Sequence, residues 1–418
     1  DVKYNRPDLV LQALNNPDTA LIHSYRRAYE KRVRKLGIDT ASFSDGFGLP
    51  EADFVNRDAI LFEQSDNVLR LRIKGKDSAF HLDRFNVWIN EAPVFGLKGV
   101  SLKNRRTNTL DTTLQVLLSN GTNIIETSVT NVNGTESFRM PLTVRHQPSV
   151  SQAEKVHFIG IGIDRFLDNR QNLNYSVKDI RDLAATLREK YGEALVMDTL
   201  FDEQVTVSNI AALRTKLLNT TVNDKVILSY SGHGLLSRQY DYFLSTYGVD
   251  FKNPEEAGLP YESLETLLDS IPARKKLVLI DACHSGEVDK EEAQQYRRVL
   301  SEKNGEGLRG GGVENTDTTQ RVGIKNSFEL MQQLFVNVGR STGATVISAA
   351  GGLQLAQEGG GRQNGVFTYS ILEFLKKQRS ATVSELKQYV NKRVPELTNG
   401  LQQPTTRTET KQADWQVW

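Results

Sequence analysis

From residue 155 onward, short apolar runs alternate with amphipathic stripes, and this alternation constrains the fold more than any other feature of the sequence. The apolar runs, which read as buried strands, lie at 155–163, 224–231, 275–281 and 345–350. The stripes, which have helical spacing, lie at 177–187, 207–218, 367–375 and 383–394. Elements of these lengths in this order predict an α/β domain over 151–418, an α/β/α sandwich in which helices cover both faces of a mostly parallel sheet.

The first 150 residues have a different texture and predict two further units. Residues 1–50 read as a helical segment, with Pro7 near the start of one helix, Pro17 opening a second and Gly37 ending it. Six basic residues crowd the second helix, and a solvated face is preferred over a nucleic-acid site for them: Arg26, Arg27, Lys31, Arg32, Arg34 and Lys35. Residues 51–150 alternate with a period of two and contain Asn-Gly turns at 120–121 and 133–134, which predicts a small Ig-like β-sandwich.

Composition excludes several classes of function. Lys and Arg number 52 against 51 Asp and Glu, so no field of one sign attracts nucleic acid or an anionic membrane. No apolar stretch is long enough to span a bilayer, and no secretory leader opens the chain. Cys283 is the single cysteine, which rules out an intrachain disulfide and a Cys-rich zinc site and favours a cytoplasmic location. The chain begins at Asp1 without a methionine, so we expect a fragment or a processed form, with a missing N-terminal domain or a regulatory partner as candidates for what acts on it.

Two of the predicted strands end in residues that carry chemistry. The strand at 226–231 continues into Gly232, His233 and Gly234, and the strand at 277–281 continues into Ala282 and Cys283. Ligands of open parallel sheets bind beyond the carboxyl ends of the strands, so His233 and Cys283 are expected at one edge. A histidine beside a thiol favours the thiolate and then donates a proton to a leaving amine, and the N–H groups of Gly234 and Cys283 are candidates to bind an oxyanion.

Each residue of this pair also has an ordinary interpretation. Cys283 alone reads as a small core residue, and His233 alone reads as a hydrogen-bonded loop histidine. Their occurrence together at two strand ends, both embedded in glycine, favours the catalytic interpretation. His284 is a rival base, and we prefer His233 because two chemical requirements converge on its motif.

These motifs resemble those of a known family. Ser-Gly-His-Gly at 231–234 and Asp-Ala-Cys-His-Ser-Gly at 281–286 are similar to the two catalytic motifs of caspase-like cysteine peptidases, and most of all to those of metacaspases and bacterial orthocaspases. The resemblance covers about 155–395 and implies a caspase-like fold and a Cys-His dyad. Caspases have a glutamine where this chain has Asp281, so the resemblance does not extend to their selection of aspartate.

The resemblance also implies a pocket for the residue before the cleaved bond. The Ser176–Asp179 stretch aligns with a Cys-Val-Asn-Asp stretch of metacaspases whose last Asp lines this pocket, and Ser231 and Asp281 match its other positions. Two carboxylates in a narrow cleft select a guanidinium or ammonium group, which predicts substrates with Arg or Lys before the cut. The competing interpretation is a capping box from Ser176 to Asp179, with Asp281 capping the turn after its strand.

Other parts of the catalytic region carry weaker expectations. Ser348 and Ala349 begin a segment that resembles the one pairing with the substrate backbone. Asp250, Asp289 and Glu291 are candidate Ca²⁺ ligands, but scattered surface acids are the preferred interpretation, and we expect no required cofactor or metal. Residues 287–325 are glycine-rich, polar and basic, which predicts a flexible linker. Its ordering, or its cleavage at the Arg297–Arg298 bond or after Arg309, is expected to activate a zymogen, and a passive surface insertion is the competing interpretation.

The sequence therefore predicts a cysteine endopeptidase acting on protein substrates. A catalytically silent caspase-like module that serves as a binding partner is the alternative, and retention of both His233 and Cys283 argues against it. A thiolate used for acyl transfer instead of hydrolysis is a third hypothesis that the motifs do not separate from the first.

Overall fold

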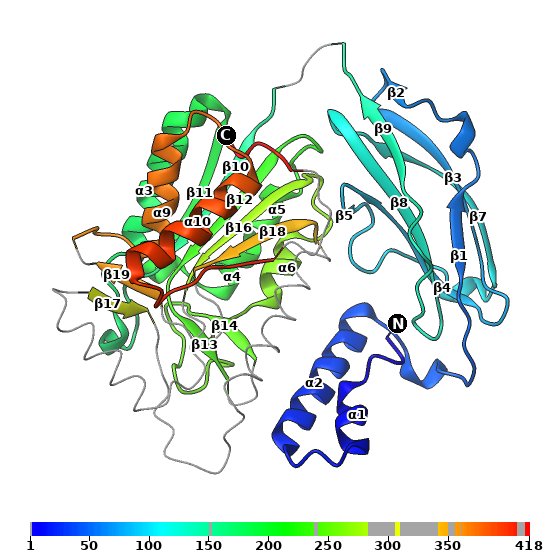
Figure 1. The fold of residues 1–418 in the computed structure, drawn as a ribbon, viewed down its shortest axis with the longest axis horizontal. Helices are drawn as coiled ribbons and strands as arrows, with labels where there is room; N and C mark the ends of the chain where they lie inside the picture. The colour runs from blue at the N-terminus through cyan, green and yellow to red at the C-terminus, as the bar shows by residue number, and fades with distance from the viewer. Residues whose placement is uncertain are drawn as a thin grey trace.

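The carboxyl-terminal part of the protein is built on a mostly parallel sheet. The computed structural model describes residues 2–149, 153–237, 241–282, 306–309, 342–349, 356–359, 361–407 and 414–418. Within them the strand order is β11-β10-β12-β16-β18-β20 (Figure 1). The bounds are β10 Val156–Gly162, β11 Leu195–Phe201, β12 Lys225–Ser231, β16 Lys275–Asp281, β18 Ala344–Ser348 and β20 Thr405–Arg407. The first five in this order pair in parallel and β20 pairs antiparallel with β18, so the predicted fold class is confirmed.

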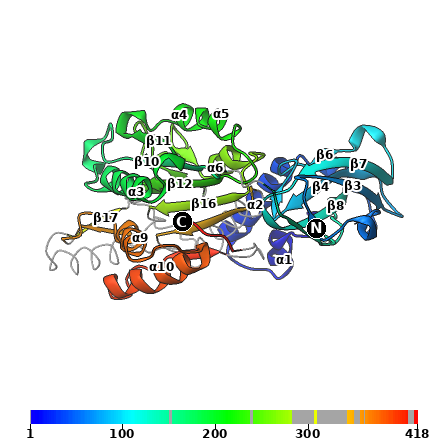
Figure 2. The same cartoon turned by 90° about the horizontal axis from the view of Figure 1, so that it is seen from above.

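Helices cover both faces of this sheet, as Figure 2 shows from above. One face packs against α4 (Val207–Ala212), α5 (Arg214–Leu217) and α6 (Glu262–Leu268), and the other against α3 (Ser176–Tyr191), α9 (Val366–Lys377) and α10 (Val383–Thr398). The strands are buried on both sides, which explains their unbroken apolar runs. Gly162 lets α3 approach β10 closely, since a Cβ atom there would lie 2.8 Å from the carbonyl oxygen of Ser176. The single helix predicted over 207–218 is divided into α4 and α5.

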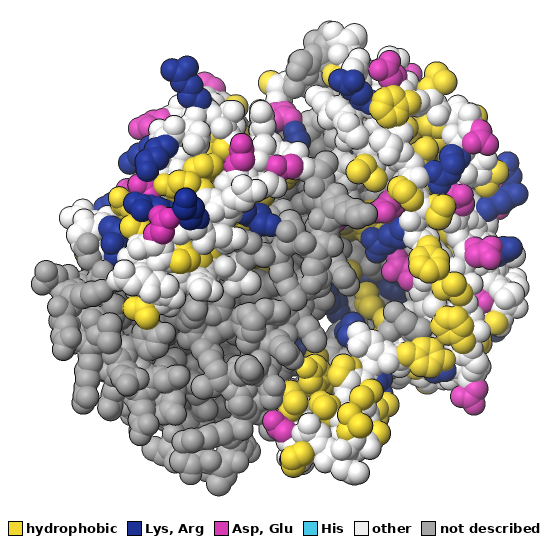
Figure 3. All heavy atoms as spheres, in the orientation of Figure 1, with side chains coloured by type: hydrophobic (Ala, Val, Ile, Leu, Met, Phe, Trp, Pro, Cys, Tyr) yellow, Lys and Arg dark blue, Asp and Glu magenta, His cyan; other side chains and the backbone are white. Residues whose placement is uncertain are grey.

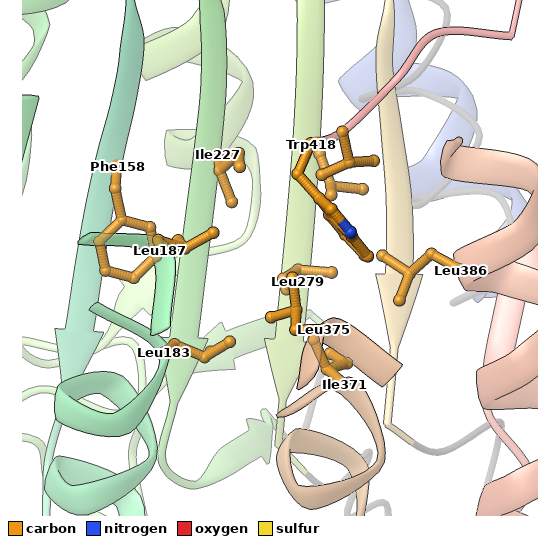
Figure 4. Close-up of a pocket in the computed structure, with 11 residues that line it drawn as sticks. Phe158, Leu183, Leu187, Ile227, Leu279, Ile371, Leu375, Leu386 and Trp418 are labelled. Carbon is orange, nitrogen blue, oxygen red and sulfur yellow. The ribbon is translucent and has the colours of Figure 1, made fainter. Parts of the chain in front are cut away.

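A small cavity lies among the apolar side chains of the second face. Its volume is about 10 Å³ and it is lined by apolar and aromatic residues, with Trp418 closing it against α3, α9 and the sheet (Figure 4). A space of this size holds at most one water, and a buried water needs about two to four polar partners, whereas the side chains of the lining offer one, the indole N–H of Trp418. The cavity is therefore a feature of core packing and lies away from the strand ends.

Residues 51–146 form two packed sheets with mainly antiparallel pairing. One sheet has the order β1-β3-β7 and the other β2-β9-β8-β4-β5, with β6 paired to β4. The bounds are β1 Glu51–Phe54, β2 Glu63–Gln64, β3 Val68–Lys76, β4 Leu82–Ile89, β5 Ala92–Pro93, β6 Val100–Ser101, β7 Thr109–Leu117, β8 Gly121–Asn131 and β9 Leu142–His146. Burial alternates along β3, and Leu71, Val87 and Ile125 share one core between the sheets. Two packed sheets agree with a sandwich, and its kinship to Ig-like domains stays a prediction.

The N-terminal helices dock onto the rest of the protein. Helix α1 spans Pro7–Ala13 and α2 spans Thr19–Leu36, and α2 ends at Gly37, whose φ of +62° is left-handed. The prediction of a wholly solvated basic face on α2 is wrong in part, because Lys31 pairs with Asp241 and Glu262 and Lys35 pairs with Glu265. These acids belong to the catalytic region, so two of the six basic residues hold the helix against it.

The face drawn in Figure 3 carries both signs of charge, with exposed apolar side chains gathered on α1. Leu9 and Val10 of that helix, and Leu14 at its C-cap, are between 48% and 72% exposed. In the described parts of the chain no helix combines the length and the apolar character that crossing a membrane requires.

Candidate active site

Three neighbouring strands end side by side at the carboxyl edge of the sheet. In the parallel register Gly162 of β10 lies beside Ser231 of β12, which lies beside Asp281 of β16. Beyond the strands, the N–H of Gly232 donates to the carbonyl oxygen of Asp281 at 3.2 Å. Position 232 requires glycine because a Cβ atom there would lie 2.6 Å from the hydroxyl of Tyr230. The chain can therefore turn tightly and carry His233 over the strand end.

The imidazole of His233 is buried, with 3% of the residue exposed, and is held on several sides. The ring lies 5.3 Å from the ring of Phe166 and 5.4 Å from that of Phe251, measured between centroids. Its Nε2 lies 2.8 Å from the carbonyl oxygen of Gln171. A carbonyl oxygen only accepts, so Nε2 carries the hydrogen and proton exchange with a thiol would use Nδ1.

Cys283 and His284 lie outside the described residues. The two residues that lead to the thiol are described, and both Asp281 and Ala282 are buried. The backbones of Gly232 and Asp281 are hydrogen-bonded to each other. His233 follows Gly232 directly, and Cys283 is two residues beyond Asp281. The chain thus brings the predicted base to the strand end from which the predicted nucleophile follows.

Gly234 begins a short hairpin that carries the histidine. Strand β13 (Gly234–Leu236) pairs antiparallel with β14 (Tyr242–Leu244), which also pairs with β15 (Leu259–Pro260). The N–H of Ser245 donates to the carbonyl oxygen of His233 at 2.9 Å, so Gly234 and Leu244 form a non-hydrogen-bonded pair. In such a pair the N–H groups point away from the partner strand, and the N–H of Gly234 therefore faces away from β14.

The side chain of Asp179 joins three elements at the sheet edge. Its Oδ2 accepts a hydrogen bond from the Ser231 hydroxyl at 3.0 Å, and its Oδ1 accepts from Asn364 Nδ2 at 2.9 Å and from the N–H of Gly365 at 3.0 Å. The capping-box interpretation is wrong, because the N-cap of α3 is Tyr175 and has no side-chain cap bond. The carboxylate instead accepts hydrogen bonds from β12 and from the start of α9.

Asp281 contacts the same helix start. Its Oδ2 accepts from the hydroxyl of Thr368 at 2.6 Å and from the N–H of Thr368 at 3.2 Å. Gly365 is the N-cap of α9 and Thr368 is its third helical residue, so Asp179 and Asp281 together satisfy two N–H groups that a helix terminus leaves unpaired. The alternative expectation, that Asp281 caps the turn after its own strand, falls on residues outside the described ones.

Three other predicted site residues use their backbone groups in bonds within the protein. The N–H of Ser176 donates to Asp164 Oδ1 at 2.7 Å, and the residue is buried beside Gly162. Ser348 lies between β16 and β20, and Ala349 uses its N–H on Ile280 and its carbonyl on Gln402. Because these groups are already paired, substrate pairing would have to begin after Ala349, at residues 350–352, which lie outside the described residues.

The candidate calcium ligands are only partly described. Asp250 Oδ1 accepts from the N–H of Lys252 at 2.8 Å and Oδ2 accepts from Asn253 at 3.0 Å, and these bonds lower its pKa below the usual range. Asp289 and Glu291 lie outside the described residues. Within the described residues no cluster of three His, Cys, Asp or Glu side chains is arranged to hold a metal ion.

The predicted flexible linker contains one described element. Residues Glu306–Arg309 form β17, which pairs antiparallel with β19 (Ala356–Gly359), so this part of 287–325 is a strand and not a structureless loop. Its partner lies about fifty positions further along the chain, which local sequence reasoning does not detect. The remainder of the linker lies outside the described residues.

Sequence reasoning missed the residues that hold the named side chains. Gln171 acts through its backbone carbonyl, so its side chain carries no signal. Asn364 and Thr368 flank the start of α9, and a helix boundary placed at Gly365 would have drawn attention to them.

The arrangement defines a class: an α/β/α sandwich with an antiparallel last strand, a histidine at one strand end and a cysteine following the next, which is a caspase-like fold. Residues 159–414, more than half of the chain, match the family model of the caspase domain, and the chain belongs to this family. Membership implies a cysteine peptidase that acts on protein substrates. The first 158 residues lie outside the matched range.

Solved structures with detectable similarity include two proteins that each cover about three fifths of this chain. The protein GSU0716 of Geobacter sulfurreducens is 19% identical with a TM-score of 0.41, covering 62% of this chain and 95% of its own. Caspase-1 of Spodoptera frugiperda is 12% identical with a TM-score of 0.41, covering 63% and 91%. Fibronectin(III)-like modules of Clostridium thermocellum CbhA are 10% identical with a TM-score of 0.20, covering 26% and 53%. No curated protein matches the chain.

Proposed function

We propose that this protein is a cysteine endopeptidase that cleaves protein substrates after Arg or Lys, with His233 and Cys283 as its catalytic dyad. The observation that carries the proposal is the position of His233. It stands at the end of β12 beside β16, the strand that continues into Cys283, and its Nε2 is tied to the carbonyl of Gln171. Family membership supports the same chemistry.

Apart from the substrate and water, the proposed reaction needs only groups of the protein itself. Cys283 attacks the substrate carbonyl as a thiolate that the His233 imidazolium stabilises, and the N–H groups of Gly234 and Cys283 bind the oxyanion that forms. The imidazolium then donates a proton to the leaving amine, and water hydrolyses the acyl-enzyme with His233 as base. No cofactor enters these steps, so a chelator should leave the rate unchanged. A rate that rises with added Ca²⁺ would contradict this.

The preference for Arg or Lys rests on Asp179 and Asp281. Both are buried at the strand ends, and their described donors Ser231, Asn364 and Thr368 are neutral. Hydrogen bonds of this kind stabilise a carboxylate without cancelling its charge, and a charged carboxylate at this edge attracts a cationic side chain. Ser176 closes the same region behind Gly162.

A fluorogenic peptide panel tests the proposal directly. Peptides with Arg, Lys or Asp before the reporter are incubated with wild type and with Cys283→Ala. We expect Arg and Lys peptides to be cleaved, Asp peptides to be spared and the variant to be inactive while melting normally. Undiminished cleavage by Cys283→Ala would remove the cysteine mechanism. Preference for Asp peptides would remove the pocket assignment, and a wholly inactive wild type would favour the silent binding module.

Asp281→Asn separates the charge of the pocket from its hydrogen bonding. The asparagine oxygen can still accept from the N–H and hydroxyl of Thr368, so the start of α9 keeps its cap. We expect cleavage after Arg to fall at least about tenfold with little change in melting temperature, because only the attraction for the cation is lost. An equal loss with a neutral peptide would assign Asp281 a structural role alone.

The activation proposal concerns the linker at 287–325. The Arg297–Arg298 bond and the bond after Arg309 fit the proposed specificity, and Arg309 is the last residue of β17. Proteases bind substrates in extended form, so β17 would have to leave β19 before cleavage there. Mass spectrometry of purified protein decides: two fragments split within 287–325 in wild type and an intact Cys283→Ala support activation by cleavage, whereas an uncut and fully active wild type contradicts it.

A further inference from the structure

A closed ring of hydrogen bonds surrounds the backbone of His233, and it includes the hydroxyl groups of Tyr230 and Ser245. The N–H of His233 donates to Ser245 Oγ at 3.2 Å. Ser245 Oγ lies 2.8 Å from the hydroxyl of Tyr230, which in turn lies 3.1 Å from the carbonyl oxygen of His233 and 2.9 Å from that of Ser245. The N–H of Ser245 donates to the carbonyl of His233 at 2.9 Å. Both sides of the His233 backbone are therefore held.

The donors and acceptors in this ring are consistent. His233 N–H donates to Ser245 Oγ, the serine hydroxyl donates to the tyrosine oxygen, and the tyrosine hydroxyl donates to a backbone carbonyl. Each hydroxyl gives one hydrogen and accepts one. Tyr230 and Ser245 are both 0% exposed, so water does not compete for these bonds.

Packing alone does not account for the tyrosine hydroxyl. Tyr230 belongs to the apolar core on the α4–α6 side of the sheet, where phenylalanine would fill the same space without a buried polar group. The hydroxyl lies instead under the turn at Gly232, between the strand that ends at Ser231 and the histidine two residues later. Its position suits a role in fixing that turn.

We propose that Tyr230 and Ser245 are positioning residues for catalysis. They fix the backbone of His233 so that its imidazole, held at Nε2 by Gln171, presents Nδ1 to the thiol of Cys283. This inference rests on the dyad of the proposed function. A displacement of about 1 Å at the base is enough to reduce a rate by one to two orders of magnitude, so loss of either hydroxyl should be felt in the chemical step.

Five single variants and one double variant of the full chain test the inference. Tyr230→Phe and Ser245→Ala each remove one hydroxyl, and a double variant removes both. Tyr191→Phe and Ser128→Ala are matched controls, since they remove buried or partly buried hydroxyls in α3 and β8 away from His233. His233→Ala defines the effect of losing the base altogether.

The decisive measurement is the rate at which iodoacetamide alkylates Cys283 as a function of pH, because it needs no substrate. In wild type we expect a thiolate pKa below the usual value of about 8.5. His233→Ala should return the profile to that value, and Tyr230→Phe and Ser245→Ala should move it upward by at least about half a unit. With an Arg peptide, kcat should fall about tenfold with KM within twofold, the double variant should match the worse single variant, and both controls should behave as wild type.

The outcomes separate the two proposals. If His233→Ala leaves the alkylation profile unchanged, the dyad fails and the positioning role fails with it. If His233→Ala shifts the profile but Tyr230→Phe and Ser245→Ala do not, the positioning role alone is overturned. Should Tyr230→Phe not fold, Ser245→Ala carries the same test through the other hydroxyl of the ring.

Discussion

The two edges of the parallel sheet differ in charge and in what their side chains contact. At the amino edge, β12 and β16 begin with Lys225, Lys275 and Lys276, and Arg274 precedes them. At the carboxyl edge the same strands end in Ser231 and Asp281, with His233 beyond. On β16 the polar side chains lie at these two ends, where partners are within reach.

The partners of the amino edge lie at the start of the α/β domain and in the sandwich. Lys225 Nζ lies 3.3 Å from Glu154 Oε2, and Lys275 pairs with the other oxygen of that carboxylate. Arg274 donates to Ser119 Oγ at 2.8 Å and to the carbonyl of Leu117, at the turn between β7 and β8. The amino edge therefore holds the sandwich to the catalytic region, whereas the carboxyl edge carries the residues of the proposed chemistry. Substitutions at the carboxyl edge should therefore lower activity more than stability, and substitutions at the amino edge should lower stability more than activity.

The largest effect is expected at the carboxyl edge, from His233→Ala. Loss of the general acid and base should reduce kcat/KM on an Arg peptide by about 10³-fold, because proton transfer to the leaving amine is lost. The free energy of unfolding should change little by comparison. If His233→Ala retains more than a tenth of the wild-type rate, His233 is not the general base and His284 becomes the candidate for that role.

The amino edge should show the reverse pattern, tested by Arg274→Met. The guanidinium is buried, with 8% of the residue exposed, and burial lowers its pKa to about 9, so it remains charged at neutral pH. Its removal leaves the carbonyl of Leu117 and the hydroxyl of Ser119 without this donor, so unfolding in urea should become easier by about 2–4 kcal/mol. The kcat/KM of the folded variant should stay within about threefold of wild type. A large loss of rate without loss of stability would show that this edge also acts in catalysis.

How far the sequence predicts this contrast depends on the range of the interactions. The parallel sheet, its helices and the edge on which His233 lies follow from apolar periodicity and the rule for strand ends, both of which are local patterns. The roles of Arg274, Thr368 and Gln171 are not predictable in this way, because their partners lie 62 to 157 positions away along the chain. The same limit applies to β17, whose strand character depends on pairing with β19.

A third test uses pH at the amino edge. Lys276 is fully buried and donates to the carbonyl of Thr342 at 2.7 Å, and burial lowers its pKa from 10.5 to about 7, with Asp269 opposing the shift and Arg274 and Arg214 adding to it. Between pH 7 and about 10.5 the unfolded chain binds this proton and the folded chain does not, so the contribution of Lys276 makes stability rise with pH through that window.

Urea unfolding at pH 7, 8, 9 and 10 checks this sign. The difference in unfolding free energy between wild type and Lys276→Met should move in favour of wild type by up to about 1.4 kcal/mol per pH unit. Peptidase activity, measured at one pH on folded protein, should be nearly the same in both. A difference that stays constant across the series would mean that Lys276 has the same protonation in the folded and unfolded states.

The smallest effect is expected where α2 meets the hairpin that follows His233. Lys31 Nζ contacts Asp241 and lies 3.5 Å from Glu262, with 35% of the Lys31 side chain and 30% of the Asp241 side chain exposed. Solvent weakens such pairs, so Lys31→Ala should lower the free energy of unfolding by less than about 1 kcal/mol, and high salt should abolish this difference.

A double-mutant cycle with Asp241→Ala isolates the pair, and Arg26→Ala, on an exposed pair within α2, is the control. Because Asp241 lies next to β14, which carries Ser245 at its end, a coupling above 1 kcal/mol together with a fall in kcat would extend the functional edge to the N-terminal helices. A coupling near 0.5 kcal/mol with unchanged kcat would keep α2 as a purely structural contact.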